Sequence, residues 1–209
     1  MLRLAAALSA GLVAMGGWAV VTVKDLPENF VAGRQYTIEF QVRQHGHNFL
    51  SDLEPQLLLS TTPRGQEQRI PAKSLGKGSY AVTFTAPAAG QVYLTIKSGF
   101  GASDLRLYPA TVVAAGAGAA PLAPADRGRA LFVAKGCNVC HANSDLTDRP
   151  DNQQIAVGPP LGGRHLPRDF VILKLKNPGQ NMPDLGLSDA EAAAIAAFLG
   201  GDRTATTGR

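Results

Sequence analysis

The sequence is poor in the residues that cross-link chains and build metal clusters. Its 209 residues include two cysteines, three methionines and one tryptophan. Both cysteines lie in the second half, at positions 137 and 140, so no disulfide of the antibody type can join strands in the first half. The same absence excludes blue-copper and binuclear copper centres from the first half, because both need cysteine ligands.

Two further patterns are missing. No run of lysine and arginine is interleaved with aromatic residues, and the formal net charge is only +4, so nothing indicates binding to nucleic acid. No Ser-His-Asp constellation or pair of catalytic carboxylates stands out. Asp145, Asp148 and Asp151 cluster in a polar stretch, where solvated charge is the ordinary explanation. These absences favour a protein that is not itself an enzyme.

The N-terminus has the pattern of a secretory signal. Arg3 precedes an uncharged stretch rich in alanine and leucine, and AMG at 14–16 fits a small-x-small cleavage site. We therefore predict a signal peptide over residues 1–17 and a periplasmic location. The alternative is a retained membrane anchor, because Leu4–Val23 carries no charge and is long enough to span a bilayer.

Composition changes sharply near the middle of the chain. The stretch VVAAGAGAAPLAPAD at 112–126 is filled with alanine, glycine and proline, which is typical of a flexible linker. We place the linker at 113–124, between a first domain at 18–112 and a second at 125–201, with a disordered tail at 202–209. Such a linker would let the second domain swing between partners.

The first domain is predicted to be an all-β, immunoglobulin-like sandwich. Short segments rich in β-branched and aromatic residues alternate apolar and polar positions, and turns with glycine and proline separate them. Tyr93, a few residues after Pro87 and Gly90, is placed like a tyrosine that braces a sandwich corner. The expected strands are residues 18–23, 35–43, 56–61, 80–86, 91–98 and 105–113.

His45 and His47 flank Gly46 at the end of one expected strand. Side chains two positions apart on a strand point to the same face, so the two imidazoles are candidate copper ligands. The alternative is a polar strand end or turn, in which Gly46 adopts backbone angles that other residues avoid.

The segment KGCNVCHANSD at 135–145 holds both cysteines, with a histidine directly after the second. A Cys-x-x-Cys pair serves as a thiol–disulfide switch, as half of a zinc site or as the attachment point of a c-type haem. Zinc needs two more ligands, and the chain has no further cysteine. A redox switch does not require His141. Haem attachment uses every position, with thioethers from Cys137 and Cys140 and the imidazole of His141 on the iron. We predict one covalently attached haem c and keep zinc and the redox switch as alternatives.

The residues around this motif resemble the class I cytochromes c, over about Ala125–Gly200. In that family a glycine and an aromatic residue four positions later precede the haem motif, as Gly128 and Phe132 do here. The resemblance implies an all-α second domain in which the terminal helices cross at the glycine and Phe132 covers an edge of the haem. Ser188 and Glu191 predict a capping box at the start of the last helix. Another helix is expected at Arg168–Lys176.

The resemblance also implies the surroundings of the iron. GPPLGG follows the haem motif after a polar loop. In the family, the proline after this glycine offers its carbonyl to the proximal imidazole, which corresponds to Pro159 and His141 here, with Leu161 packing on the ring. The sixth ligand is assigned by elimination. Met182, in GQNMPDLG, is the one methionine of the predicted mature chain. The family presents its axial methionine in such a loop, and His165 is better placed for a surface or helix-start role.

Imidazole and thioether ligands leave no open position on the iron. This disfavours oxygen or peroxide chemistry and suits reversible one-electron transfer at a positive potential. We therefore predict an electron-transfer protein, not an enzyme by itself, whose partners are redox proteins. The first domain resembles the YtkA-like or FixH-like periplasmic domains through WAVVTVKDLPENFVAGRQYTIEFQVRQHG. That resemblance implies a link to oxidase and copper biogenesis.

Two contexts follow from these predictions. In the first, the β domain docks the cytochrome to a membrane-bound respiratory or photosynthetic complex, as a subunit of a larger oxidoreductase. Membrane association would then come through the partner or the N-terminus. In the alternative, the protein is a copper-handling or oxidase-assembly factor, in which His45 and His47 hold copper and the haem supplies electrons.

Overall fold

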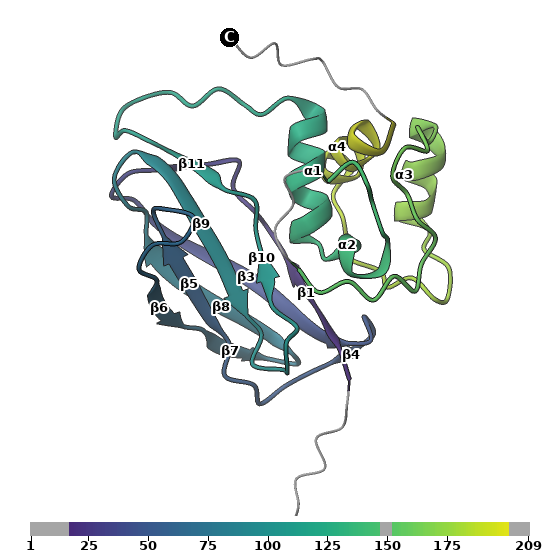
Figure 1. Ribbon diagram of the computed structural model, residues 1–209, viewed down its shortest axis with the longest axis horizontal. Helices are drawn as coiled ribbons and strands as arrows, with labels where there is room; N and C mark the ends of the chain where they lie inside the picture. Colours follow the sequence, from purple (N-terminus) through teal and green to yellow (C-terminus); the bar gives the residue numbers. More distant parts are fainter. Residues whose placement is uncertain (1–16, 147–151, 201–209) are drawn as a thin grey trace, which may run out of the picture.

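The structure, a computed structural model, describes residues 17–146 and 152–200. Two units lie side by side, a β-sandwich at residues 19–113 and a helical unit at residues 124–200 (Figure 1). The predicted order, an all-β sandwich followed by an all-α domain, is confirmed. The predicted signal peptide falls on residues outside the described ones except for its last position, and the predicted tail, Asp148 and Asp151 also lie outside them.

The first sheet is built around the longest strand. β3 (Gln35–Gln44) pairs antiparallel with β1 (Ala19–Val23) on one side and with β8 (Ser79–Thr85) on the other. β7 (Lys73–Gly76) extends the sheet beyond β8, and β4 (Asn48–Phe49) pairs with the end of β3. The register between β1 and β3 sets Val20 opposite Arg43.

The second sheet has the order β2-β11-β9-β5-β6, with β10 paired to β9. β2 runs parallel to β11, and the other pairs are antiparallel. The strands are β2 (Asn29–Val31), β5 (Gln56–Ser60), β6 (Gln68–Pro71), β9 (Gly90–Lys97), β10 (Leu105–Arg106) and β11 (Ala110–Val113). The predicted strand at 105–113 is therefore two strands. β2, β4, β6 and β7 were not predicted, because they have four residues or fewer and show little alternation.

Alternating side chains of the two sheets fill a shared core. In β8, Tyr80, Val82 and Phe84 are buried, while the residues between them are half-buried or exposed. This period of two is what the sequence pattern predicts for a strand with one face inward. The largest fully buried side chains of the sandwich are Tyr80, Phe30, Phe40, Ile38, Leu57 and Ile96.

The tyrosine that braces the sandwich differs from the predicted one. The buried Tyr80 hydroxyl donates to Leu50 O at 2.9 Å and accepts from Leu53 N at 3.2 Å. Tyr93 is half-buried, and its hydroxyl donates to the side chain of Gln91 at 3.0 Å on the surface. The prediction for Tyr93 is therefore wrong, since the residue that connects strand and loop backbone is Tyr80.

The helical unit contains α1 (Pro124–Ala134), α2 (Cys137–Cys140), α3 (Arg168–Lys176) and α4 (Asp189–Gly200). α4 begins at the predicted capping box. Ser188 N donates to Glu191 Oε2 at 3.0 Å, and Glu191 N donates to Ser188 Oγ at 3.2 Å. This reciprocal pair satisfies two backbone N–H groups that lack helical partners.

α1 and α4 cross at Gly128, as the family resemblance implies. A Cβ atom added at Gly128 would lie 1.9 Å from Ala194 O and 2.9 Å from the Cβ of Phe198. No larger residue fits without separating the helices. One turn further on, the rings of Phe132 and Phe198 pack with their centroids 5.6 Å apart.

β1 lies at the boundary between the two units, and all five of its residues are buried (Figure 1). Alternate side chains enter the sandwich core, whereas Val20 and Thr22 face the helical unit. A Cβ added at Gly136 would lie 2.3 Å from Val20 Cγ1, so the two residues are in close contact. Thr22 Oγ1 donates to Lys135 O at 3.3 Å. The helical unit therefore covers the outer face of β1.

The linker, residues 114–123, runs along the sandwich. Asn29 Nδ2 donates to Ala120 O at 3.2 Å, and Leu122 N donates to Glu28 Oε2 at 3.0 Å. These bonds and the packing on β1 hold the two units together. This arrangement is at odds with the predicted swinging movement, which rested on linker composition alone.

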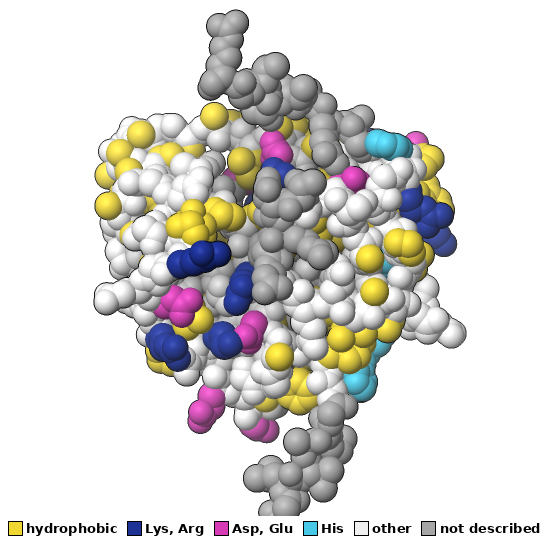
Figure 2. Space-filling model, viewed as in Figure 1, with side chains coloured by type: hydrophobic (Ala, Val, Ile, Leu, Met, Phe, Trp, Pro, Cys, Tyr) yellow, Lys and Arg dark blue, Asp and Glu magenta, His cyan; other side chains and the backbone are white. Residues whose placement is uncertain are grey.

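None of the helices within residues 17–146 and 152–200 combines the length and the apolar character needed to cross a bilayer. On the face shown in Figure 2, basic and acidic side chains are interspersed rather than gathered by sign.

Candidate functional site

The Cys-x-x-Cys-His segment begins where α1 ends. Ala134 is the last residue of α1 and Lys135 is its C-cap, and Gly136 then reverses the chain with φ +76°, a conformation that favours glycine. α2 is a single turn that carries Cys137 and Cys140, and His141 follows in an extended conformation. Gly136 is thus required twice, for its backbone angle and for its close approach to β1.

A backbone carbonyl holds the imidazole of His141. Its Nδ1 lies 2.9 Å from Pro159 O, which is the contact that the family resemblance implies. Gly158 lets this loop approach, because a Cβ there would lie 2.6 Å from the imidazole Cε1. Because a carbonyl oxygen only accepts, Nδ1 is the donor in this bond, and Nε2 is the ring nitrogen that a metal would bind.

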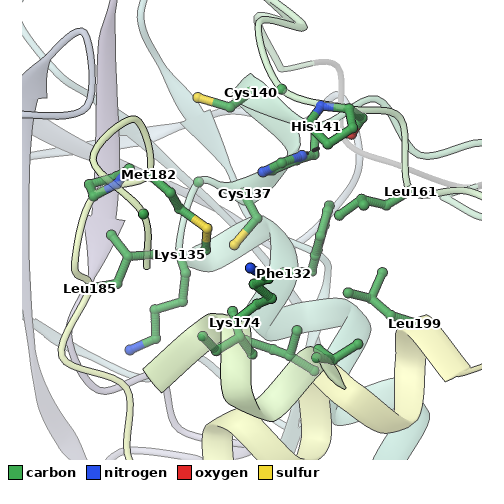
Figure 3. A pocket seen from close by; sticks show the side chains of 18 of the residues that line it. Phe132, Lys135, Cys137, Cys140, His141, Leu161, Lys174, Met182, Leu185 and Leu199 are labelled. Carbon is green, nitrogen blue, oxygen red and sulfur yellow. Dashed lines mark hydrogen bonds between the residues drawn. The ribbon is translucent and has the colours of Figure 1, made fainter. Parts of the chain in front are cut away.

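Met182 lies on the loop between α3 and α4. A turn forms before it, with Met182 N donating to Gly179 O at 3.0 Å. After it, Gly186 N donates to Asp184 Oδ1 at 2.9 Å. The loop brings the half-buried Met182 side chain to the side of the helical unit that carries Cys137 (Figure 3).

These segments surround one cavity of about 520 Å³. Figure 3 shows side chains of both cysteines, His141 and Met182 around the same space. Among the described residues, the structure brings together all seven that the sequence assigned to a haem site in the second domain. They are Phe132, Cys137, Cys140, His141, Pro159, Leu161 and Met182.

Further lining residues were not predicted. Val20 comes from β1 of the sandwich, Phe170 and Val171 come from α3, and Ile195 and Leu199 come from α4. The helical pattern of α4 indicated that Ile195 and Leu199 are inward-facing, but a cavity wall and a filled core have the same pattern. The contribution of Val20 depends on how the two units pack.

Burial raises the pKa values of the two cysteine thiols. Desolvation raises the pKa of Cys137 to about 12, with a further contribution from Cys140 and a smaller opposing one from Lys135. Burial also raises the pKa of Cys140. Both residues are therefore thiols rather than thiolates at neutral pH in the folded chain without a bound group. Thiol–disulfide exchange uses a thiolate, so this environment does not favour a redox switch.

A buried ion pair includes Lys135, one of the residues that line the cavity. The side chain of Lys135 is 2% exposed, and its Nζ lies 2.7 Å from Glu191 Oε1. Nζ also donates to Lys24 O at the end of β1. Burial alone would raise the pKa of Glu191, but hydrogen bonds from Lys135 and Ser188 outweigh it and leave that pKa lowered. Sequence reasoning missed this pair, because the partners come from α1 and α4.

The two histidines of the sandwich lie in a turn. β3 ends at Gln44, and His45 and Gly46 have φ values of +53° and +80°. The ring of His45 packs beside Trp18, and both His45 and His47 are exposed. The premise that they share one face of a strand is therefore wrong, and the turn interpretation describes them correctly. In the described part of the chain, no three His, Cys, Asp or Glu side chains gather as a metal site would require.

The cavity fits a c-type haem. Its volume lies in the range of roughly 300–1,000 Å³ that pockets for cofactor-sized ligands have. Most of its walls are apolar, and its lining groups include both thiols, a thioether and an imidazole whose Nδ1 is held by a backbone carbonyl. Such a donor set suits iron that exchanges electrons without binding substrate.

Residues 123–199 match the sequence profile of the family described as "Cytochrome C oxidase, cbb3-type, subunit III". No curated protein matches the chain. Similar solved structures include the Lin-41 filamin domain, with 19% identity, a TM-score of 0.34, and coverage of 46% of this chain and 90% of that chain. The Escherichia coli adhesin FdeC shows 19% identity and a TM-score of 0.33, with 47% and 32% coverage. The superoxide reductase (neelaredoxin) of Ignicoccus hospitalis shows 11% identity and a TM-score of 0.30, with 49% and 86% coverage. Likenesses this low carry no information on function. The profile match and the helical fold identify the second half of the chain as a cytochrome c domain, related to an oxidase subunit, and this domain implies electron transfer.

Proposed function

We propose that this chain is an exported monohaem c-type cytochrome that carries single electrons between redox proteins in the periplasm. Cys137 and Cys140 would attach the haem through thioethers, and His141 and Met182 would be the axial ligands of its iron. The observation that carries the proposal is the convergence of these four side chains on one cavity within a cytochrome c domain.

Each residue of the site has a defined task in this proposal. A bound haem supplies a reversible one-electron couple between ferrous and ferric iron. Pro159 O fixes the orientation and tautomer of His141. The thioether of Met182 is a soft donor that favours ferrous iron, and apolar walls such as Phe132 and Ile195 disfavour the additional charge of ferric iron. With His141 and Met182 both bound to it, the iron would have no open position for oxygen or peroxide.

The β-sandwich would hold the cytochrome beside a membrane-bound respiratory or photosynthetic complex. Two observations support this role. We infer from its sequence that the sandwich is similar to YtkA-like and FixH-like domains, and the cytochrome domain matches a family described as an oxidase subunit. Because the linker and β1 hold the two units together, the docked partner would receive the cytochrome in a fixed orientation.

Native purification tests the docking. Membranes from the source cells are solubilised gently, and c-type haem absorbance is followed through size-exclusion chromatography beside the soluble periplasmic fraction. We expect the haem absorbance to migrate with a large integral-membrane complex. Haem absorbance found only in the soluble fraction, at the size of one chain, would contradict docking and leave a free electron shuttle.

A variant of the iron ligand separates docking from electron transfer. Met182 lies on a loop of the helical unit and outside the sandwich. Met182→Ala should therefore migrate with the same complex as the wild type while its reduction potential changes. Loss of co-migration in this variant would mean that the cytochrome domain, rather than the sandwich, provides the contact.

A further inference from the structure

We propose that the β-sandwich positions the Met182 loop, through Arg43 and Gly46, and so resists displacement of Met182 by external ligands. This inference rests on the haem site of the proposed function. It assigns to the sandwich a role inside the molecule in addition to docking, and Arg43 is a positioning residue in this role.

The first contact is apolar and lies next to the methionine. Gly46, in the turn after β3, is buried and has φ +80°. A Cβ added there would lie 3.5 Å from Pro183 Cγ and 3.9 Å from Val20 Cγ2. The Pro183 ring therefore packs directly on the backbone of this turn. Because Pro183 follows Met182 in the chain, the turn limits how far the methionine can retreat from the cavity.

The second contact is polar and lies one residue further along the loop. Arg43 is 7% exposed, and its Nη1 donates to Asp184 O at 3.4 Å. Burial lowers the pKa of Arg43, and the nearby charge of Asp184 opposes this effect. A guanidinium this buried needs fixed partners, and the loop provides one of them.

Arg43 is itself held rigidly. Its Nη2 donates to Gln41 Oε1 on the same strand, and its guanidinium lies over the ring of Phe49, 4.9 Å from the ring centroid. Because these two contacts restrain the side chain of Arg43, its Nη1 points toward the loop in a constant direction. The sandwich thus provides an anchor for a loop that contains two glycines and two prolines.

The same pair of strands also contacts the opposite side of the cavity. Val20 on β1 is directly paired with Arg43 on β3, so both side chains lie on one face of the sheet. Val20 lines the cavity and packs against Gly136, the residue before Cys137. One cross-strand pair therefore touches the segment before the first cysteine and the segment after the methionine. The sheet fixes the spacing between these two sides.

This geometry has a measurable consequence. An external ligand such as imidazole replaces Met182 on ferric iron only if the loop moves away from the cavity. Local opening of this kind has a free energy set by the contacts that the loop loses. The contacts of Arg43 and Pro183 with the sandwich add to that free energy, so weakening them should make imidazole bind more tightly.

The test is the affinity of the purified ferric holoprotein for imidazole, measured by loss of the sulfur-to-iron charge-transfer band. We expect Arg43→Gln to bind imidazole about tenfold more tightly than the wild type, since hydrogen bonds to charged donors are among the stronger ones. Arg43→Lys keeps the charge but not the fork of donors and should lie between the two. Arg34→Gln is the matched control. Arg34 precedes β3 at the end opposite to Arg43 and stacks over Tyr36, so its removal should leave the affinity unchanged.

A second variant is used for the test if replacement of the buried Arg43 unfolds the protein. Asp184 is exposed, and asparagine can still accept the bond from Gly186 N. Asp184→Asn removes the charge that faces Arg43, and we expect imidazole to bind about threefold more tightly. Equal affinities for the wild type, Arg43→Gln and Asp184→Asn would overturn the inference.

The failure of the proposed function gives a different result. If Met182→Ala keeps the charge-transfer band of the wild type, or if the wild type lacks it, Met182 is not the ligand. The ligation and the positioning role then fail together. If Met182→Ala abolishes the band and the Arg43 and Asp184 variants behave as the wild type, only the positioning role fails.

Discussion

The two halves of the molecule differ in what fills their interiors. The sandwich interior is filled by its own side chains, with Tyr80, Phe40 and Leu57 fully buried. The helical half surrounds a cavity of about 520 Å³ instead. Its α3 buries one residue, Val171, and Phe170 on the same helix lines the cavity while remaining 47% exposed. The sandwich core is therefore filled by its own side chains, whereas the helical half encloses a space large enough for the proposed haem.

This contrast also explains why the sandwich supports the helical unit where the two units meet. A domain built around a cofactor has loops at its cavity rim, and loops hold ligands less rigidly than strands do. Here two strands of the sandwich support the helical unit. Val20 on β1 lines the cavity, and Arg43 on β3 donates to the Met182 loop.

Removal of both thiols should have the largest effect. Cys137→Ser with Cys140→Ser abolishes the two predicted attachment points, so covalent haem should be lost completely. Without an occupant, α1 and α4 lose contacts across the cavity, whereas the sandwich core is unchanged. Hydrogen exchange should show protection kept in β3 and β8 and lost in α1 and α4. Equal protection of the helices in the wild type and the variant would show that the helical half does not depend on a bound group.

A change at the helix crossing should destabilise only the helical half. Gly128→Val places a side chain where a Cβ would already lie 1.9 Å from Ala194 O. We expect its free energy of unfolding to fall by about 3 kcal/mol. Chemical denaturation followed by helical circular dichroism measures this. Gly118→Val is the matched control, because nothing lies within 4 Å of a Cβ at Gly118. Equal losses in both variants would show that the crossing is not tightly packed.

The ion pair of Lys135 and Glu191 should give a smaller and pH-dependent effect. Glu191→Gln keeps the shape of the side chain but weakens the bond to Lys135, and we expect a loss of about 2 kcal/mol of unfolding free energy at pH 7. The lowered pKa of Glu191 means that its stabilising contribution is present above its ordinary pKa, about 4.3. The contribution is lost as the pH falls through the folded-state pKa. The difference between variant and wild type should therefore shrink below about pH 4.

Asp189→Asn serves as the control for that measurement. Asp189 pairs with Lys176, which lowers its pKa, but its side chain is 97% exposed. Solvent screens such a pair, so the substitution should leave the stability at pH 7 close to that of the wild type. A loss as large as that of Glu191→Gln would mean that burial does not distinguish the two pairs.

Removal of the two histidines of the sandwich should have the smallest effect, which is measured on copper binding. His45 and His47 lie in an exposed turn, and the ring of His45 packs beside Trp18. Copper titration of the full chain and of the double variant His45→Ala/His47→Ala, followed by calorimetry, should therefore give the same weak binding. Tight binding of one copper ion that is lost in the double variant would revive the copper-handling alternative.

Much of the site was predictable, because its chemistry depends on short-range spacing. Cys137 and Cys140 lie on one helical turn and His141 follows directly, so their spacing along the chain predicts that they lie close together. Pro159 and Met182 lie further away. The resemblance to a known family predicts the role of Pro159, and the role of Met182 is predicted by elimination together with that resemblance. The capping residues Ser188 and Glu191 follow a local rule in the same way.

The remainder depends on contacts between segments that are far apart in the chain. The run AVVTV predicts a strand, and its continuous apolar character is typical of burial on both faces. The run itself does not indicate which segment covers the outer face. Lys135 belongs to the haem motif, yet its burial depends on Glu191. The error at His45 and His47 has a local cause, since the left-handed backbone at His45 and Gly46 ends β3 one residue before the pair begins.

Spectroelectrochemical titration of the purified full chain tests the central claim most directly. The absorbance of a c-type haem and the number of electrons transferred are recorded together as the potential is varied. The account predicts one reversible transition of haem absorbance with a one-electron slope, at a positive potential. A two-electron transition at a negative potential without haem absorbance would contradict it and would identify Cys137 and Cys140 as a thiol–disulfide switch.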